Sequence, residues 1–144
     1  MSDPDIFDLR DFTPYLLNLA AEQSSLAFQP HYKDRYGMLR TEWRVVFHLG
    51  RYGAMTAKEI CTRARLHKTK VSRAVTALEK NRFLVKSTLE KDRRLELLQL
   101  TKAGQSAYAD LSDAARKFDA DLMGQFTENE REVLRRCLSR IAGF

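Results

Sequence analysis

The basic side chains of this 144-residue chain are concentrated in one segment. Residues 65–94 hold ten lysines and arginines but only three acidic residues, which gives a net charge of +7. The whole chain has 25 basic and 19 acidic residues and a net charge of +6, so the rest of the chain sums to −1. A local basic excess of this kind is typical of a site for a polyanion such as nucleic acid.

Short polar side chains recur at helical spacing inside this segment. One stripe of a helix predicted from about His67 to Asn81 consists of Thr69, Ser72, Arg73 and Thr76. A solvated helix face is the plain alternative, but such faces usually favour longer Glu, Lys and Gln side chains. Short hydroxyl groups suit a face that closely approaches a ligand. Arg73 among them is the candidate for a bidentate contact with guanine.

Further candidates for contacts with nucleic acid flank this stripe. Those at helix starts, where free backbone N–H groups suit a phosphate, are Thr56, Lys58, His67, Lys68 and Lys70. The predicted tip of a following hairpin consists of Lys91, Asp92, Arg93 and Arg94. Arg93 is the candidate for insertion into the minor groove, with Asp92 orienting it through a charge-assisted pair. A hairpin tip that is merely solvated is the alternative.

Cap residues and apolar periodicity predict the elements that position these groups. Thr13 is the expected cap of a first helix that bends or ends near Pro30 and closes at Gly37. Thr41 is the expected cap of a second helix. Residues 56–59 form a capping box that opens a third helix.

The second half of the chain adds a hairpin and two helices. In the fourth helix, the predicted core stripe is Val71, Ala74, Val75 and Leu78. Two strands, 83–85 and 95–100, are expected on either side of a charged loop, 87–94. Thr101 then caps a long helix with a heptad-like apolar seam, and a capping box at Thr127 opens a closing helix.

The composition argues against several other classes of protein. The chain is 44% hydrophobic and 31% charged, so it can bury a core. No apolar run approaches the ~18 residues of a membrane span, and the acidic start argues against a secretory signal, so we expect a cytoplasmic protein without a membrane partner. We see no catalytic-triad spacing, metal-ligand cluster or glycine-rich phosphate loop. We therefore expect no catalytic residues, no metal and no cofactor.

The order of the predicted elements and their motifs resembles the MarR family of winged helix-turn-helix transcription regulators. The motifs similar to those of the family are TEWRVV (41–46), TAKEI (56–60), VSRAVTALE (71–79) and DRR (92–94) followed by LQLTKAG (98–104). The resemblance covers about residues 14–142. It implies a mainly α fold with a small β-wing, in one integrated domain with three parts. These are an N-terminal dimerisation arm and helix (1–40), a winged helix-turn-helix lobe (41–100) and C-terminal dimerisation helices (101–144).

The resemblance also implies partners and a mode of action. Members of the family act as homodimers on pseudo-palindromic double-stranded DNA, and we expect a repressor of this kind. A two-fold dimer places two recognition helices about 34–36 Å apart, one turn of DNA. The chain departs from the family at Arg82, where glycine is usual. Because a left-handed arginine costs about 1 kcal/mol or more, we expect Asn81 to carry that turn instead.

Many members of the family bind a small phenolic or carboxylated effector between the dimer helices and the DNA-binding lobe. The residues expected to line such a cleft are Tyr15, Asn18, Leu19, Tyr36, Met38, Trp43, Arg44, Phe47 and His48. Arg44 is the candidate for an effector carboxylate, because it is a cation on a largely apolar helix. An ion pair with Glu22, Asp34 or another acid is the alternative for Arg44. Core packing is the alternative for the aromatic residues.

Two other functions stay open from the sequence. A thiol-based redox switch would use Cys61 or Cys137. Both cysteines, however, lie at apolar positions of predicted helices, where cysteine is usually a small core residue. A purely architectural DNA or RNA binder would have the same basic segment without any preference for sequence.

Overall fold

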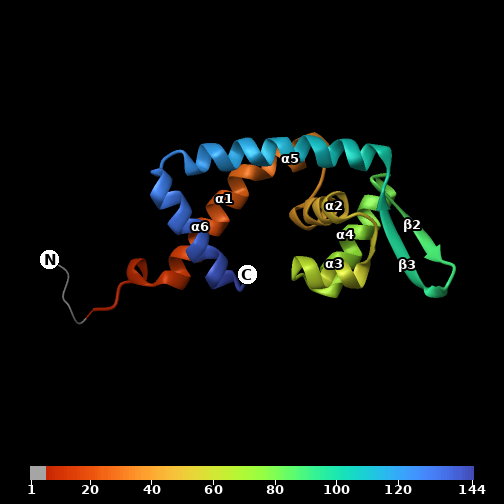
Figure 1. Cartoon of the computed structure of the whole chain (residues 1–144), viewed down its shortest axis with the longest axis horizontal. Helices are drawn as coiled ribbons and strands as arrows, with labels where there is room; N and C mark the ends of the chain where they lie inside the picture. The colour runs from red at the N-terminus through yellow and green to blue at the C-terminus, as the bar shows by residue number, and fades with distance from the viewer. Residues whose placement is uncertain (1–5) are drawn as a thin grey trace.

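The computed structural model describes residues 6–144 and shows an elongated, mainly helical chain with a small three-stranded sheet (Figure 1). The elements are η1 (Leu9–Asp11), α1 (Thr13–Tyr36), α2 (Arg40–Tyr52), β1 (Met55–Thr56), α3 (Ala57–Ala64), α4 (Lys68–Lys80), β2 (Leu84–Leu89), β3 (Asp92–Leu100), α5 (Lys102–Met123) and α6 (Glu128–Ala142). The predicted fold class is confirmed. None of the helices in residues 6–144 is long and apolar enough to cross a membrane.

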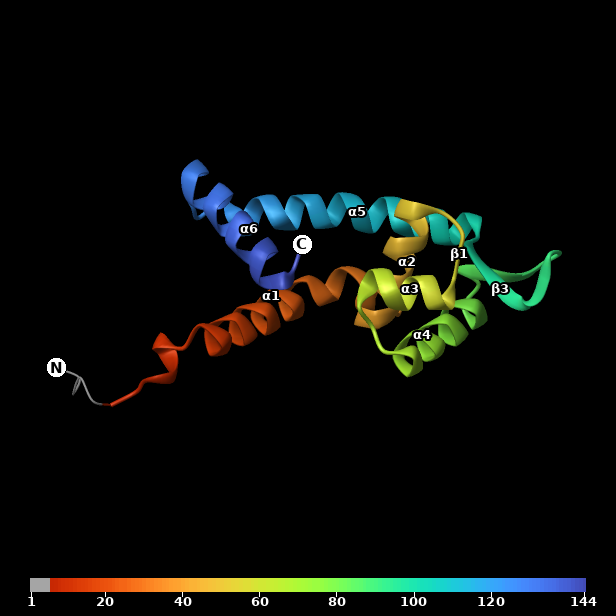
Figure 2. The same ribbon diagram turned by 60° about the horizontal axis from the view of Figure 1, so that its bottom comes forward.

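The long helix α5 connects two ends of different character. The lobe formed by α2, α3 and α4 lies at one end, and the wing of β2 and β3 projects from it in both views (Figures 1 and 2). At the other end lie η1, the first half of α1 and α6. The lobe therefore presents α4 and the wing at the end opposite α6.

The caps predicted for the last two helices are confirmed, and one further cap was not predicted. That cap is His67 of α4, whose ring Nδ1 accepts from the backbone N–H of Thr69 at 3.2 Å. The hydroxyl of Thr101 caps α5 by accepting from Gly104 N–H at 3.1 Å. Thr127 opens α6 with both bonds of a capping box. Hydrogen bonding by Thr127, first from its backbone N–H and then from its side chain, holds the pKa of the Glu130 carboxyl below its usual value.

The predicted starts of the first two helices are wrong by one or two residues. Thr13 is the first residue inside α1 and Phe12 is its cap, whereas α2 begins at Arg40 after the cap Leu39. Neither cap residue has a side chain that can cap the helix. In α2, a residue of the first turn instead supplies the hydrogen-bond acceptor for a free backbone N–H group. There, the buried Glu42 carboxylate accepts from the backbone N–H of Leu39 at 2.9 Å.

Pro30 does not end the first helix. α1 continues through it to Tyr36 and closes, as predicted, at Gly37, whose φ is 66°. A proline within a helix removes one backbone hydrogen bond and normally kinks or breaks it. Here, the turns after Pro30 are held by tertiary packing, because Phe28 and Tyr32 are buried against Trp43.

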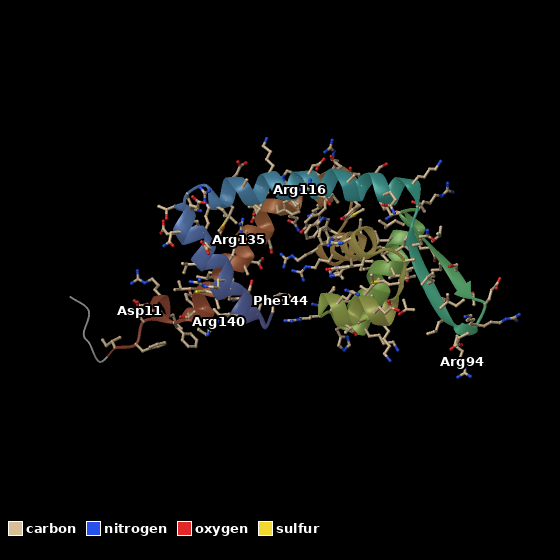
Figure 3. The ribbon with its side chains drawn as sticks, viewed as in Figure 1. Asp11, Arg94, Arg116, Arg135, Arg140 and Phe144 are labelled. Carbon is tan, nitrogen blue, oxygen red and sulfur yellow. The ribbon has the colours of Figure 1, made fainter. Side chains whose placement is uncertain are left out.

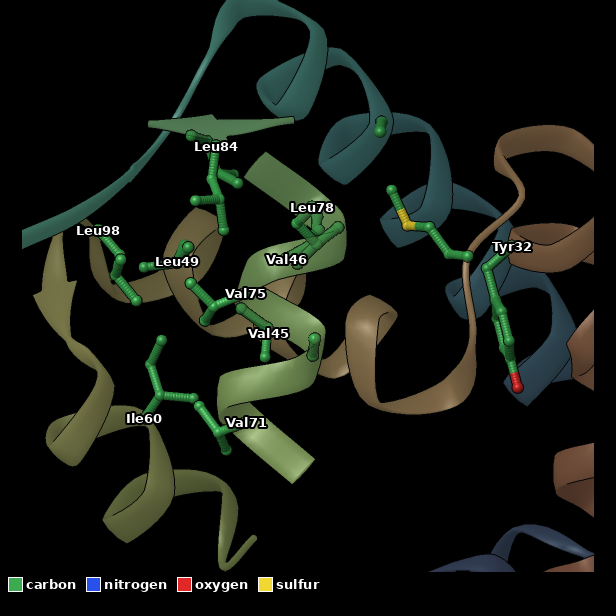
Figure 4. Close-up of a cluster of buried hydrophobic side chains, with 14 of the residues drawn as sticks. Tyr32, Val45, Val46, Leu49, Ile60, Val71, Val75, Leu78, Leu84 and Leu98 are labelled. Carbon is green, nitrogen blue, oxygen red and sulfur yellow. The ribbon is translucent and has the colours of Figure 1, made fainter. Parts of the chain in front are cut away.

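The core of the lobe lies where the predicted apolar stripe of α4 meets α2. Its four members, Val71, Ala74, Val75 and Leu78, are all buried. Figure 4 shows three of them packed among side chains from other elements, including Val45, Val46, Leu49, Ile60, Leu84 and Leu98. Burying a side chain of this size stabilises the fold by roughly 1.5–3 kcal/mol. This packing positions the opposite, polar face of α4 toward solvent.

The wing is longer than predicted, and its loop is shorter. The antiparallel ladder runs from Leu84↔Leu100 to Thr88↔Glu96 and, after an irregularity, to Leu89↔Asp92. Only residues 90 and 91 form the turn, so the expected loop over 87–94 is wrong. Backbone pairing extends the strands beyond the core, because a ladder bond needs a partner strand and not a buried side chain.

The sheet also contains a strand that the sequence did not predict. β1 pairs with the inner half of β3, with Met55 opposite Leu98, and gives the strand order β1–β3–β2. Two residues are too few to show a strand periodicity. Both paired side chains are buried, so β1 ties the start of α3 to the wing.

Arg82, and not Asn81, carries the left-handed turn after α4. The φ of Arg82 is 64°, whereas that of Asn81 is −86°. The backbone N–H of Arg82 donates to Glu79 O at 3.0 Å, and that of Phe83 donates to Leu78 O at 2.9 Å. These are the two bonds of a Schellman motif, which requires a left-handed residue at the first of the two donors. The prediction for Asn81 is therefore wrong.

Replacing Arg82 with glycine is expected to stabilise the protein by up to about 1 kcal/mol, because glycine adopts a positive φ without the steric cost that arginine has. Thermal and urea unfolding would measure this gain. Asn81→Gly is the matched control: its φ is already right-handed, so glycine there should bring no gain. Equal effects of the two substitutions would contradict the assignment of strain to Arg82.

Candidate DNA interface and effector pocket

The polar stripe of α4 lies on the surface. Thr69, Ser72, Arg73 and Thr76 are all exposed, directly across the helix from the buried stripe. Within residues 6–144, Arg73 forms no ion pair, so its guanidinium is available to a ligand. The hydroxyl of Thr76 already donates to Ser72 O at 3.0 Å, which leaves its oxygen as an acceptor for an outside group.

Cations and cap residues surround the start of α4. Because the His67 Nδ1 accepts the Thr69 N–H, the ring proton lies on Nε2, which can donate to a phosphate. Lys68 and Lys70 are exposed in the first turn of the helix. The N-terminus of α4 therefore presents two kinds of hydrogen-bond donor, the imidazole of His67 and the ammonium groups of Lys68 and Lys70.

Thr56 and Lys58 lie at the start of the preceding helix, α3. The Thr56 hydroxyl accepts from Glu59 N–H at 3.2 Å and caps the helix. The return bond of the predicted capping box, in which the Thr56 backbone N–H would donate to the Glu59 carboxylate, is not formed among the described residues. Half of that prediction is therefore confirmed. The Lys58 side chain is exposed.

The tip of the wing carries exposed Lys91, Asp92, Arg93 and Arg94. Figure 3 shows Arg94 pointing away from the body of the molecule. The Asp92 carboxylate accepts from the backbone N–H of Arg94 at 3.0 Å, and in the described part of the chain it forms no ion pair with Arg93. The expected Asp92–Arg93 pair is thus wrong. A carboxylate two residues from a backbone donor shapes the turn more readily than it reaches its neighbour's side chain.

The positive charge of this end is hardly neutralised. Of the ten basic residues in 65–94, only Lys86 forms an ion pair among residues 6–144, with Glu79 at 3.7 Å and Glu96 at 4.0 Å. The recognition-helix face and the wing tip thus present unpaired cations at the same end of the molecule. Unpaired lysines and arginines of this kind meet phosphates and release the counterions of DNA.

A separate pocket of about 240 Å³ lies between α2 and the end of α3. α2 contributes four of the predicted effector residues, Trp43, Arg44, Phe47 and His48. The other side comes from residues 63–65 and from Phe144, none of which was predicted. No local pattern joins Phe144 to α3. Arg63 and Arg65 had a weak signal in the sequence, because they are basic residues at the end of the short helix α3.

Arg44 is exposed in this pocket and forms no ion pair within residues 6–144. Glu22, one of the acids considered for it, lies instead 4.0 Å from Arg40. His48 Nδ1 lies 2.7 Å from the backbone oxygen of Arg44. Because a carbonyl oxygen only accepts, Nδ1 carries a proton, and Nε2 of the neutral ring is left as an acceptor.

The other predicted effector residues lie elsewhere. Met38 is 1% exposed in the core, and Tyr15, Asn18 and Leu19 on α1 do not line the pocket. The single chain does not place these three residues in the cleft. They lie in the first half of α1, which is the end of the helix farther from the lobe (Figure 2).

Tyr36 is also outside the pocket and has a structural role. Its hydroxyl donates to Asp110 Oδ2 at 2.6 Å, and Arg35 pairs with the same carboxylate at 2.9 Å. Burial, followed by the bond to the Asp110 carboxylate, raises the pKa of Tyr36 above its usual value. These contacts join the end of α1 to α5.

The two cysteines are free thiols in different surroundings. Cys61 is half-buried and packs against the core of the lobe. Cys137 is exposed on α6, so the expectation that it is a small core residue is not met in the single chain. The apolar face of α6 lacks a partner element within residues 6–144, which explains this exposure.

A helical lobe with an exposed basic recognition helix, followed by a two-stranded wing with a basic tip, defines a winged helix-turn-helix DNA-binding protein. A model of the MarR family matches residues 36–95 of the chain. These matches support a MarR-family winged helix-turn-helix regulator.

Individual proteins are similar over most of the chain. The uncharacterized HTH-type transcriptional regulator YwoH of Bacillus subtilis is 29% identical over 100 residues, which cover 69% of this chain and 72% of YwoH. A MarR/EmrR family regulator from Acinetobacter sp. ADP1 is 26% identical with a TM-score of 0.83, covering 94% of this chain and 96% of the other. BpsR of Bordetella bronchiseptica, whose DNA binding is regulated by 6-hydroxynicotinic acid, is 19% identical with a TM-score of 0.87. The match covers 96% of this chain and 99% of BpsR.

Proposed function

We propose that the protein is a homodimeric repressor that binds a pseudo-palindromic operator and leaves it when a small anionic aromatic effector binds. It acts through binding and not through catalysis. The observation that carries the proposal is the set of unpaired cations on α4 and the wing, which face away from the core at one end of the chain. Footprinting on the DNA upstream of its own gene, repeated with a panel of aromatic acids, would test it as a whole.

The exposed groups divide into three kinds of DNA contact. Base edges in the major groove would be read by Thr69, Ser72, Arg73 and Thr76. Phosphates would be held by Thr56, Lys58, His67, Lys68 and Lys70. The wing would reach the adjacent minor groove through Arg93, with Lys91 and Arg94 on the backbone and Asp92 shaping the turn.

The proposed dimer rests on apolar side chains that the single chain leaves exposed. They lie in residues 6–12, in α1 and in α6, and they are Ile6, Phe7, Leu9, Phe12, Leu16, Leu19, Leu26, Val133, Leu138 and Ile141. A patch of this extent on a monomer marks an interface. We infer that a second copy covers it through residues 1–40 and 101–144. The lobe of residues 41–100 is then left free for DNA.

The proposed effector site is the pocket between α2 and α3, with Arg44 as the anchor for an anionic group. Aromatic rings and a cation without a partner suit an aromatic acid. The structural neighbour BpsR, regulated by 6-hydroxynicotinic acid, supports an effector of this class. An effector bound there would shift DNA affinity by its differential affinity for the free and DNA-bound arrangements of the lobe.

Arg93→Ala is expected to weaken operator binding by about 1–3 kcal/mol, because it removes one groove contact. The melting temperature should not change, since an exposed residue at the wing tip packs against little. Fluorescence anisotropy at fixed salt would measure the affinity. Arg116→Ala, on the face of α5 away from the wing (Figure 3), controls for the loss of one charge. Parental affinity of Arg93→Ala would remove this residue from the interface.

Arg44→Ala is expected to keep operator affinity and to lose release by the effector. The side chain has no ion-pair partner in the described structure, so the change in stability should stay within about 0.5 kcal/mol. Melting temperature, operator affinity and release by aromatic acids would be measured on the same variant. Arg51→Ala, on the same helix but outside the pocket lining, is the control. A destabilised Arg44→Ala variant with normal release would refute the anchor.

A further inference from the structure

The pocket between α2 and α3 carries more positive charge than one carboxylate can neutralise. Three guanidinium groups line it, those of Arg44, Arg63 and Arg65, and no acidic residue does. The contrast with a second cavity is clear. That cavity, about 500 Å³ between α1 and α5, sets Arg35 and Lys117 against three aspartates. The side-chain charges of that cavity sum to −1, whereas those of the first pocket sum to +3.

Neutral groups hold two of the three guanidiniums in place. Arg63 Cζ lies 4.4 Å from the centre of the Tyr52 ring. Arg65 donates to the backbone oxygens of Ala142 and Gly143 and lies 4.4 Å from the centre of the Phe144 ring. Carbonyl oxygens and aromatic rings orient a cation without cancelling its unit charge. Both arginines are therefore pre-oriented and still electrostatically unsatisfied.

The remaining walls suit a flat ring. Trp43, Phe47 and Phe144 line the pocket with aromatic faces and edges, and the Trp43 and Phe47 ring centres are 6.0 Å apart. His48 adds an uncharged polar group to the lining, and its Nε2 is left to accept a hydrogen bond. These aromatic walls add apolar contact with a ring to the charge-assisted pairs that the three exposed guanidiniums offer.

We infer that the pocket takes an aromatic ligand with two anionic groups, one at Arg44 and the other at Arg63 and Arg65. This inference rests on the effector role proposed above and names the class of effector. Arg65 is the residue after α3 and stands two positions before His67, the cap of α4. A second anionic group that draws Arg65 from the carbonyl oxygens of Ala142 and Gly143 thus acts directly at the start of the recognition helix.

The chain contains a single tryptophan, Trp43, and it lines this pocket, so its fluorescence responds to a ligand bound there. The probes are benzoate, isophthalate and terephthalate at constant ionic strength. At least one dicarboxylate is expected to bind about tenfold or more tightly than benzoate, because its second carboxylate forms an additional charge-assisted pair with an arginine. Arg63→Gln and Arg65→Gln should each remove most of that advantage and change benzoate binding little. Lys33→Gln, an exposed cation outside the pocket lining, should change neither.

The outcomes separate this inference from the effector role. Benzoate that binds as tightly as both dicarboxylates overturns the dianionic class. If benzoate then also releases the operator, the effector role stands. Tight dicarboxylate binding without operator release keeps the ligand class and refutes the effector role. No quenching of Trp43 by any of the three overturns the inference, and persistence of the dicarboxylate advantage in Arg63→Gln and Arg65→Gln overturns the assignment of those side chains.

Discussion

A chain carrying Leu138→Asp and Ile141→Asp is expected to be monomeric and to lose about 10²–10⁴-fold in operator affinity. Both side chains lie on α6 and are 41% and 61% exposed in the single chain, so neither contributes to its core. In the proposed dimer they are buried, and two carboxylates there cost far more than they do in water. Without the dimer, binding of the second half-site is no longer intramolecular, and its effective concentration is lost.

Sedimentation velocity would give the mass of this variant, and anisotropy on a duplex selected in vitro would give its affinity. Ser139→Asp is the control. It adds a carboxylate to the same exposed turns of α6 but replaces a polar residue, so the dimer should persist. Far-ultraviolet circular dichroism would check that both chains stay helical. A folded monomer with parental affinity for the full palindrome would contradict the proposed dimer.

Gly104→Ala is expected to destabilise the protein by about 3 kcal/mol, the upper part of the usual range for overpacking. A Cβ atom on Gly104 would lie 2.1 Å from the backbone oxygen of Phe83 and 3.1 Å from the Leu100 side chain. Gly104 stands in the first turn of α5, beside Phe83, which precedes β2, and Leu100, which ends β3. Because the obstacle is a backbone carbonyl, either the helix or the wing must move.

Chemical denaturation would measure the loss of stability, with Gly124→Ala as the control. Gly124 has a right-handed φ of −63°, and a Cβ there would approach no atom closer than 3.2 Å, so the change should be small. We also expect weaker operator binding by the folded fraction of Gly104→Ala, since the wing is displaced relative to α4. A variant as stable as the parent would show that α5 and the wing are not locked together at this point.

Most features that depend on near neighbours were predicted correctly, with the starts of α1 and α2 as exceptions. α4 was expected from about His67 to Asn81 and runs from Lys68 to Lys80 between these two caps. Its buried stripe and its exposed stripe also follow the prediction. The hydroxyls of Thr101 and Thr127 cap their helices as expected. Each of these features is set by hydrogen bonds and side-chain spacing within about one or two helical turns, which the sequence displays directly.

Features that depend on distant partners were missed or misplaced. The wing strands continue to Leu89 and from Asp92 because they pair with each other, and β1 exists only because β3 lies beside it. The turn at Arg82 is fixed by the end of α4, and the Thr101 hydroxyl, 19 residues later, donates to its carbonyl oxygen at 2.7 Å. Local propensity favoured Asn81, and this tertiary arrangement overrode it.

The candidate sites divide in the same way. The charge and the polar stripe of the DNA-binding face could be recognised from the sequence alone, because a surface helix shows its pattern without reference to the rest of the fold. The pocket could not. Trp43, Arg44, Phe47 and His48 share one helix and were predicted together, but Arg65 meets the carbonyl oxygen of Gly143 across 78 residues. Periodicity describes one element at a time, and only the tertiary structure, which brings residues 142–144 beside Arg65, decided which cations line the pocket.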